Sequence, residues 1–228
     1  RLDLLELAGQ RTLDYFRAPD RQDGAADDLG RRARTLHILG EIESRRGDLP
    51  KAKALFAEAR QITARAYAAT PRDPARLFEH AESMFWIGYL DWREGRQAEA
   101  ETAFVEHARL SAALVTLEPK NPKWLKESAT ASLNLGALRY QRGAYPAALP
   151  AFESASRAWS ALVAVSPADR DVQLSLAQVA SWLADTRRAL GAFEAALAER
   201  EQESRTYTAL LEREPDLEAA RQMLPVVE

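Results

Sequence analysis

The sequence predicts an all-α fold built from antiparallel helix hairpins, and three observations predict it. Glycine recurs every 48 residues at Gly40, Gly88 and Gly136, and Ala184 holds the fourth place in the series. Apolar residues between these markers follow helical spacing, with no strand-like alternation. Proline closes each repeated unit, at Pro71, Pro119, Pro167 and Pro215. An internal repeat of helical periodicity is typical of stacked helix hairpins.

Three further columns of residues keep the same register in each unit. A second glycine follows the first after seven residues, an alanine comes five residues later, and an aromatic residue comes four residues after that. The columns are Gly47, Gly95, Gly143 and Gly191; Ala52, Ala100, Ala148 and Ala196; and Phe56, Phe104 and Phe152, with Arg200 in the fourth copy. Small residues in the Gly40 and Ala52 columns let two helices approach, and the phenylalanines are predicted to fill the space between successive hairpins.

Start and stop signals divide each unit into two helices joined by a tight turn. Asp73-Pro74 and Asn121-Pro122 are typical of an N-cap followed by proline at the first helical position. The second glycine of each unit suits a helix C-cap. We therefore expect a leading helix over 2–17, first helices over 28–46, 74–94, 122–142 and 170–190, second helices over 49–70, 97–118, 145–166 and 192–214, and a last helix from about 216.

The whole chain, 1–228, is expected to be a single repeat domain that was cut from a longer protein. Residues 1–26 form its leading helix and loop, followed by repeats at 27–72, 73–120, 121–168 and 169–216 and a partial C-terminal helix at 217–228. The loop over 18–26 is the only long one. Pro150 falls inside a second helix, so that helix is expected to start late or kink there.

Composition excludes several classes of function. The formal net charge is −3 with both signs scattered along the chain, so no basic face predicts nucleic-acid binding. The chain has no cysteine, which excludes disulfides, thiolate metal sites and a cysteine nucleophile. Phosphate loops, zinc motifs and nucleophile elbows are missing, and His37, His80 and His107 are too far apart for a local metal motif. We therefore expect no enzyme activity, cofactor, metal or direct membrane insertion.

The repeat columns resemble the tetratricopeptide repeat (TPR) family over nearly the whole chain. The resemblance rests on Leu39-Gly40, Ile87-Gly88 and Leu135-Gly136 and on the downstream glycine, alanine, aromatic and proline positions. The units are 14 residues longer than the roughly 34-residue family unit. The excess falls as seven residues in each helix, close to two turns, so the buried faces keep their phase. The resemblance implies a right-handed TPR-like α-solenoid.

In that family the first helices line a concave groove, which implies a set of binding positions here. The groove candidates are His37, Glu41, Phe85, Tyr89, Trp92, Arg93, Tyr140, Asp185 and Arg188. We assign Tyr89 and Trp92 to the groove and leave Phe85 open between groove and packed core. Trp86 and Trp182 share a column and are interpreted as packing residues. Aromatic and arginine side chains suit a recognition hot spot.

The opening sixteen residues and the Phe85-Trp86-Ile87-Gly88 segment also resemble C-terminal repeat regions of bacterial signalling proteins, including serine/threonine protein kinases. This implies a sensory or regulatory module that binds a protein or peptide, or else a small ligand. It would be periplasmic if attached to a transmembrane kinase, and otherwise cytoplasmic. The alternative is a scaffold that forms homo-oligomers and brings effector domains together. Exposed apolar residues on the last helix, such as Leu217, Met223 and Leu224, would favour it.

Overall fold

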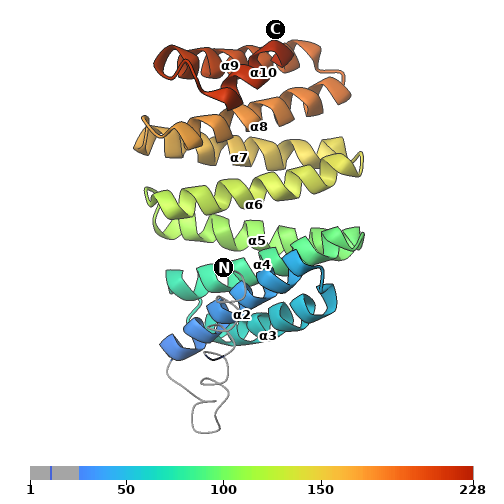
Figure 1. Cartoon of the computed structure of the whole chain (residues 1–228), viewed down its shortest axis with the longest axis vertical. Coiled ribbons are helices and arrows are strands. Elements are labelled where there is room, and N and C mark those ends of the chain that lie inside the picture. Colours follow the sequence, from blue (N-terminus) through green and yellow to red (C-terminus); the bar gives the residue numbers. More distant parts are fainter. Residues whose placement is uncertain (1–10, 12–25, 228) are drawn as a thin grey trace. The chain divides into compact units, whose positions relative to one another are not determined.

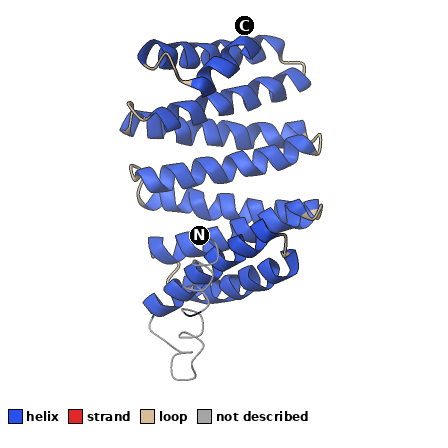
Figure 2. Ribbon diagram, viewed as in Figure 1, coloured by secondary structure: helices blue, strands red, loops and turns tan. Residues whose placement is uncertain are grey.

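The computed structural model describes Arg11 and residues 26–227, and the predicted all-α fold is confirmed over this part of the chain (Figure 2). The chain divides into two compact units, Arg1–Leu117 and Glu118–Glu228. The helices of the first unit are α2 (Ala26–Arg46), α3 (Leu49–Ala69), α4 (Pro74–Arg93) and α5 (Gln97–Leu117). Those of the second are α6 (Pro122–Gln141), α7 (Tyr145–Val165), α8 (Arg170–Ala189), α9 (Phe193–Arg213) and α10 (Glu218–Val227).

Within each unit, helices that follow one another in the chain pack side by side (Figure 1). The hairpin pairs are α2 with α3, α4 with α5, α6 with α7, and α8 with α9. The second helices begin at residues 49, 97, 145 and 193, each 48 residues after the one before. The helix bounds agree with the expected ones to within two residues. The predicted leading helix over 2–17 and nearly all of the loop over 18–26 lie outside the described residues.

Local capping chemistry sets where these helices begin and end. The side chain of Asp73 accepts a hydrogen bond from the backbone of Ala75, and Asn121 accepts one from Lys123. Both precede a proline at the start of a helix, as predicted. The four turn glycines have φ between 72° and 90°, a region that only glycine enters freely, at Gly47, Gly95, Gly143 and Gly191.

The first glycine position of each of the first three repeats has no room for a side chain, because a phenylalanine ring lies against it. A Cβ added to Gly40 would come within 2.4 Å of the Phe56 ring, and one added to Gly136 within 2.6 Å of the Phe152 ring. Phe56, Phe104 and Phe152 are fully buried. Each of the first three hairpins is therefore held together by a close helix approach into which one aromatic ring fits.

The next first helix in the same unit covers that ring with a tryptophan. Trp86 of α4 stacks on Phe56, with ring centroids 4.9 Å apart and an interplanar angle of 10°. Trp182 of α8 stacks on Phe152 at 5.4 Å and 14°. The interpretation of Trp86 and Trp182 as packing residues is confirmed.

Of the two alternatives expected at Pro150, the late start is wrong, because helix α7 begins at Tyr145 and contains Pro150. A kink at Pro150 stays a prediction. The apolar residues on the last helix are not freely exposed, because Leu217, Met223 and Leu224 pack against Tyr207 and its neighbours. The exposed apolar side chains of the last hairpin belong instead to α9 and the turn before it, where Phe193 is 68% and Leu197 61% exposed.

Among the described helices, none combines the length and the low polarity that a bilayer span requires.

Candidate partner-binding surface

The first unit carries a ladder of aromatic and cationic side chains along α4. The rings of Phe85 and Tyr89, one helical turn apart, lie 6.0 Å from each other at 24°. The guanidinium carbon of Arg93, one turn further, lies 5.8 Å from the centre of the Tyr89 ring. Phe85 and Tyr89 are partly exposed, and Arg93 is exposed. Three successive turns therefore present large side chains that a partner can contact.

Contacts with neighbouring helices hold this ladder in place. Phe85 packs on Phe104 and on His107 of α5, with ring centroids 6.4 and 5.7 Å away. Arg93 donates hydrogen bonds to the hydroxyl oxygen of Ser44 at 2.9 Å and to its carbonyl oxygen at 3.3 Å. Because Ser44 lies near the end of α2, the first hairpin fixes the direction of the arginine. Phe85 is thus both a packing residue and a surface residue.

Three other predicted groove residues of the first unit occupy different positions. Trp92 lies edge-on to Phe104, 5.9 Å away and at 87°, and is partly exposed. Glu41 pairs with Arg45 of its own helix at 2.5 Å. His37 is only 3% exposed, so it lies in the interface between α2 and α4 instead of on an open surface.

The remaining predicted groove residues lie in the second unit. The Tyr140 ring lies 5.2 Å from that of Trp182 and 5.1 Å from that of Tyr145. Asp185 contacts Arg188 at 3.4 Å. Burial, and then the charge of Asp185, raises the pKa of the Tyr140 hydroxyl above its usual value. Tyr140 and Asp185 thus belong to one local environment, with Arg188 at its exposed edge.

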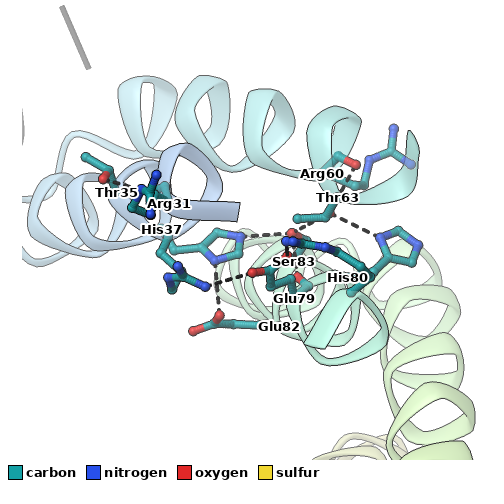
Figure 3. Close-up of polar contacts among 11 residues, drawn as sticks. Arg31, Thr35, His37, Arg60, Thr63, Glu79, His80, Glu82 and Ser83 are labelled. Carbon is teal, nitrogen blue, oxygen red and sulfur yellow. Dashed lines mark hydrogen bonds and ion pairs between the residues drawn. The ribbon is translucent and has the colours of Figure 1, made fainter. Parts of the chain in front are cut away.

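A buried polar network around His37 was not predicted (Figure 3). The Nε2 atom of His37 lies 2.9 Å from the hydroxyl oxygen of Ser83, which in turn lies 2.9 Å from that of Thr63. Thr63 also contacts Nδ1 of His80 at 3.2 Å. The Nδ1 atom of His37 faces a carboxylate oxygen of Glu82 at 3.4 Å. These contacts join α2 and α3 to α4 through polar side chains.

Ser83, His37 and Glu82 follow the order of a serine–histidine–acid triad, but their arrangement does not support nucleophilic catalysis. Ser83 is fully buried, and its hydroxyl donates to the carbonyl oxygen of Glu79 at 3.2 Å. The Ser83 hydroxyl oxygen also lies 2.9 Å from both His37 Nε2 and the Thr63 hydroxyl, so it is enclosed by side chains of α2, α3 and α4, whereas the nucleophile of a catalytic triad must face a substrate. A substrate has no access to that oxygen. The network therefore serves packing. Its signal in the sequence was His37, which stands in a column that holds Phe85 and Leu133 in the next two repeats.

No group of three histidine, aspartate or glutamate side chains in the described part of the chain is placed to hold a metal ion.

Comparison with known proteins gives a likeness of fold. No protein-family model matches the chain, and no curated protein matches it either. Among solved structures, the chain is similar to BtubC (BKLC) from P. vanneervenii, at 19% identity over 92% of both chains and a TM-score of 0.53. It also aligns with TTC0263, a thermophilic TPR protein of Thermus thermophilus, at 16% identity over 97% of this chain and 98% of that one, with a TM-score of 0.41. At such identities the likeness to BtubC shows the fold alone.

Proposed function

Since the chain has a TPR-type helical-repeat fold, we propose that it is a non-catalytic binding module that recognises a protein or peptide partner on the aromatic ladder of α4. The single observation that carries the proposal is the run of Phe85, Tyr89 and Arg93 on three successive turns, each accessible and each stacked on the next. Tyrosine, tryptophan and arginine are the residues that dominate binding energy at protein interfaces.

Preorganisation supports the same function. A long side chain that becomes ordered on binding costs about 0.5–1.5 kcal/mol. The hydrogen bonds from Arg93 to Ser44 and the packing of Phe85 on Phe104 restrict these side chains before a partner arrives. A partner that buries the ladder therefore loses little affinity to ordering.

We place this module in a larger bacterial signalling protein, as the sensory or regulatory part next to an effector such as a serine/threonine kinase. The support is the resemblance of the opening residues and of the Phe85-Trp86-Ile87-Gly88 segment to kinase-linked repeat regions.

The test is quantitative binding to a partner identified by affinity capture and mass spectrometry. Tyr89→Ala and Arg93→Ala are each expected to weaken binding at least about tenfold, in the range of interface hot spots. Val105→Ala is the matched control, since Val105 is a 42% exposed residue on the neighbouring helix α5. Equal affinity of the wild-type chain and both α4 variants would exclude the ladder as the binding surface.

Self-association is the alternative function, and the apolar side chains on the last hairpin favour it. Phe193 and Leu197 lie one turn apart on α9, close to Leu190, which is 40% exposed. Leu49, the counterpart of Phe193 in the first repeat, packs against the buried cluster of Ala52, Phe56 and Leu90, to which the following first helix α4 contributes Leu90. Light scattering over a range of concentrations tests this alternative: Phe193→Ser should reduce the mass of any oligomer, and a monomer at every concentration would exclude it.

A further inference from the structure

The fourth hairpin carries a charged cluster where the third hairpin has an apolar core. Four positions that are one repeat apart change together, in α8 and α9. Leu133, Ala137, Phe152 and Ala155 of the third hairpin correspond to Ser181, Asp185, Arg200 and Glu203 of the fourth. Apolar residues satisfy the same fold at these positions, so helix packing does not require the charges.

Arg200 connects all the polar members of this cluster. Its guanidinium donates to Ser181 at 2.8 Å, to Glu203 at 2.7 Å and to Asp185 at 2.9 Å. Glu203 is fully buried, and its second carboxylate oxygen, Oε1, has no hydrogen-bond partner in the described part of the chain. Burial raises the pKa of the Glu203 carboxyl above its usual value, against the opposing effect of Arg200. The cluster therefore holds an acceptor that is not used within it.

A cavity of about 440 Å³ lies beside this cluster, between α8, α9 and α10. Its size falls in the range of small-molecule sites, about 300–1,000 Å³. The cavity is lined by Leu174, Ser175, Gln178, Ser181, Trp182, Asp185, Tyr207, Ala219 and Met223. Ser181 and Asp185 are thus shared between the charged cluster and the cavity wall.

Two polar atoms in this wall, the Tyr207 hydroxyl and Oδ2 of Asp185, have no hydrogen-bond partner among the described residues. Tyr207 is only 3% exposed, and no contact in the described part of the chain gives its hydroxyl a hydrogen-bond partner. Asp185 receives Arg200 and Arg188 at the same oxygen, Oδ1, and no described contact uses its Oδ2. Arg188 is 68% exposed, so water screens its charge. A ligand that donates hydrogen bonds would satisfy these atoms.

We propose that this cavity binds an organic cation, with an ammonium or guanidinium group directed at Asp185 and its carbon chain against Trp182 and Tyr207. Aromatic faces attract cations, and a carboxylate in a partly buried wall forms strong charge-assisted hydrogen bonds with them. Arg200 occupies Oδ1 of Asp185, so the cation is directed at the second carboxylate oxygen, Oδ2. The site belongs to the second unit and is independent of the aromatic ladder on α4.

Isothermal titration calorimetry on the chain tests the proposal with three probes. 1,4-Diaminobutane represents a free amine, and N-acetyl-Ala-Arg-Ala-amide represents a basic side chain of a peptide. N-acetyl-Ala-citrulline-Ala-amide is the neutral control of nearly the same shape. At least one cation should bind saturably and at least about tenfold more tightly than the citrulline peptide. Saturation by the diamine alone identifies a free amine, and saturation by the arginine peptide alone identifies a peptide side chain. Equal saturable binding of the arginine and citrulline peptides, or no saturation by either cation at about 10 mM, would overturn it.

Three variants connect that binding to the cavity. Asp185→Asn keeps the shape and removes the charge, and should weaken the cation at least about tenfold. Asp171→Asn is its matched control, because Asp171 is a highly exposed carboxylate on the same helix. Ala219→Leu narrows the cavity without touching the charged cluster and should also weaken binding, which keeps the proposal testable if Asp185→Asn fails to fold. A folded Ala219→Leu variant with wild-type affinity would place the cation elsewhere.

Discussion

The ring of Trp86 lies flat on that of Phe56, with centroids 4.9 Å apart, and Phe56 in turn lies against Gly40 on its own hairpin. The second unit repeats this arrangement with Trp182, Phe152 and Gly136. One residue from each of three consecutive helices thus forms the contact that couples hairpin to hairpin. If this contact stabilises the fold by close packing, adding a methyl group to it should destabilise the protein, and so should removing a ring from it.

Gly136→Ala should destabilise the second unit although alanine favours helices. The added Cβ would lie 2.6 Å from the Phe152 ring, and such overpacking costs about 1–3 kcal/mol. The gain in helix propensity is about 1 kcal/mol. Urea denaturation followed by circular dichroism should show a net loss in the unfolding free energy. In a Phe152→Leu background the same change should become neutral or stabilising, and a stabilised single variant would contradict the packing argument.

Phe104→Ala should destabilise the first unit by about 3–5 kcal/mol, since the ring is fully buried and its removal leaves a cavity. The adjacent Val105 is 42% exposed, so Val105→Ala should change stability by less than about 1 kcal/mol. Chemical denaturation of both variants measures the difference. Similar losses of stability for Phe104→Ala and Val105→Ala would show that the Phe104 side of α5 does not form a core.

Acid should weaken the junction between the first two hairpins through His80. Burial lowers the pKa of His80 below its usual 6.5, against the raising effect of Glu106, and Arg60 and Arg109 lower it further. A histidine with a lowered folded pKa adds stability above pH 6.5, and that stability is lost as the pH falls through the folded pKa. Unfolding measured between about pH 7.5 and 5 should therefore show a loss of stability.

His80→Leu should reduce that loss, because the corresponding residue of the fourth repeat is Leu176 and the column accepts a leucine. The variant can lose some stability at neutral pH, since Thr63 loses a hydrogen-bond partner. Its stability should nevertheless vary less over the same pH range than that of the wild-type chain. An unchanged pH profile would assign the effect to other groups.

Glu203→Gln should stabilise the second unit at neutral pH. The folded pKa of Glu203 is raised, so its protonated form favours folding below the unfolded pKa near 4.5, and this contribution is lost as the pH rises through the folded value. Glutamine is neutral throughout. The advantage of the variant should be present at about pH 7 and should vanish below about pH 4.5. A variant that is less stable than the wild type at neutral pH would show that the pairing with Arg200 outweighs the cost of burial.

The helix pattern could be predicted from the sequence because the signals that set it are local. The N-caps Asp73 and Asn121, the turn glycines and the phase of the apolar residues act within one or two helical turns, and the structure places the helix ends within two residues of the expected positions. Pro150 is an exception, since its local preference against a helix interior is overridden in α7.

The candidate sites depended on contacts between helices, which one column of residues cannot show. His37 and Phe85 share a column, yet His37 is buried against Ser83 and Glu82, whereas Phe85 remains partly exposed. Likewise, only the placement of α9 and α10 beside α8 brings Asp185 and Tyr207 to one cavity. The sequence alone determined the helices and their period, because caps and spacing act along the chain. The tertiary structure decided which side chains reach solvent, because burial depends on partners far away in the sequence.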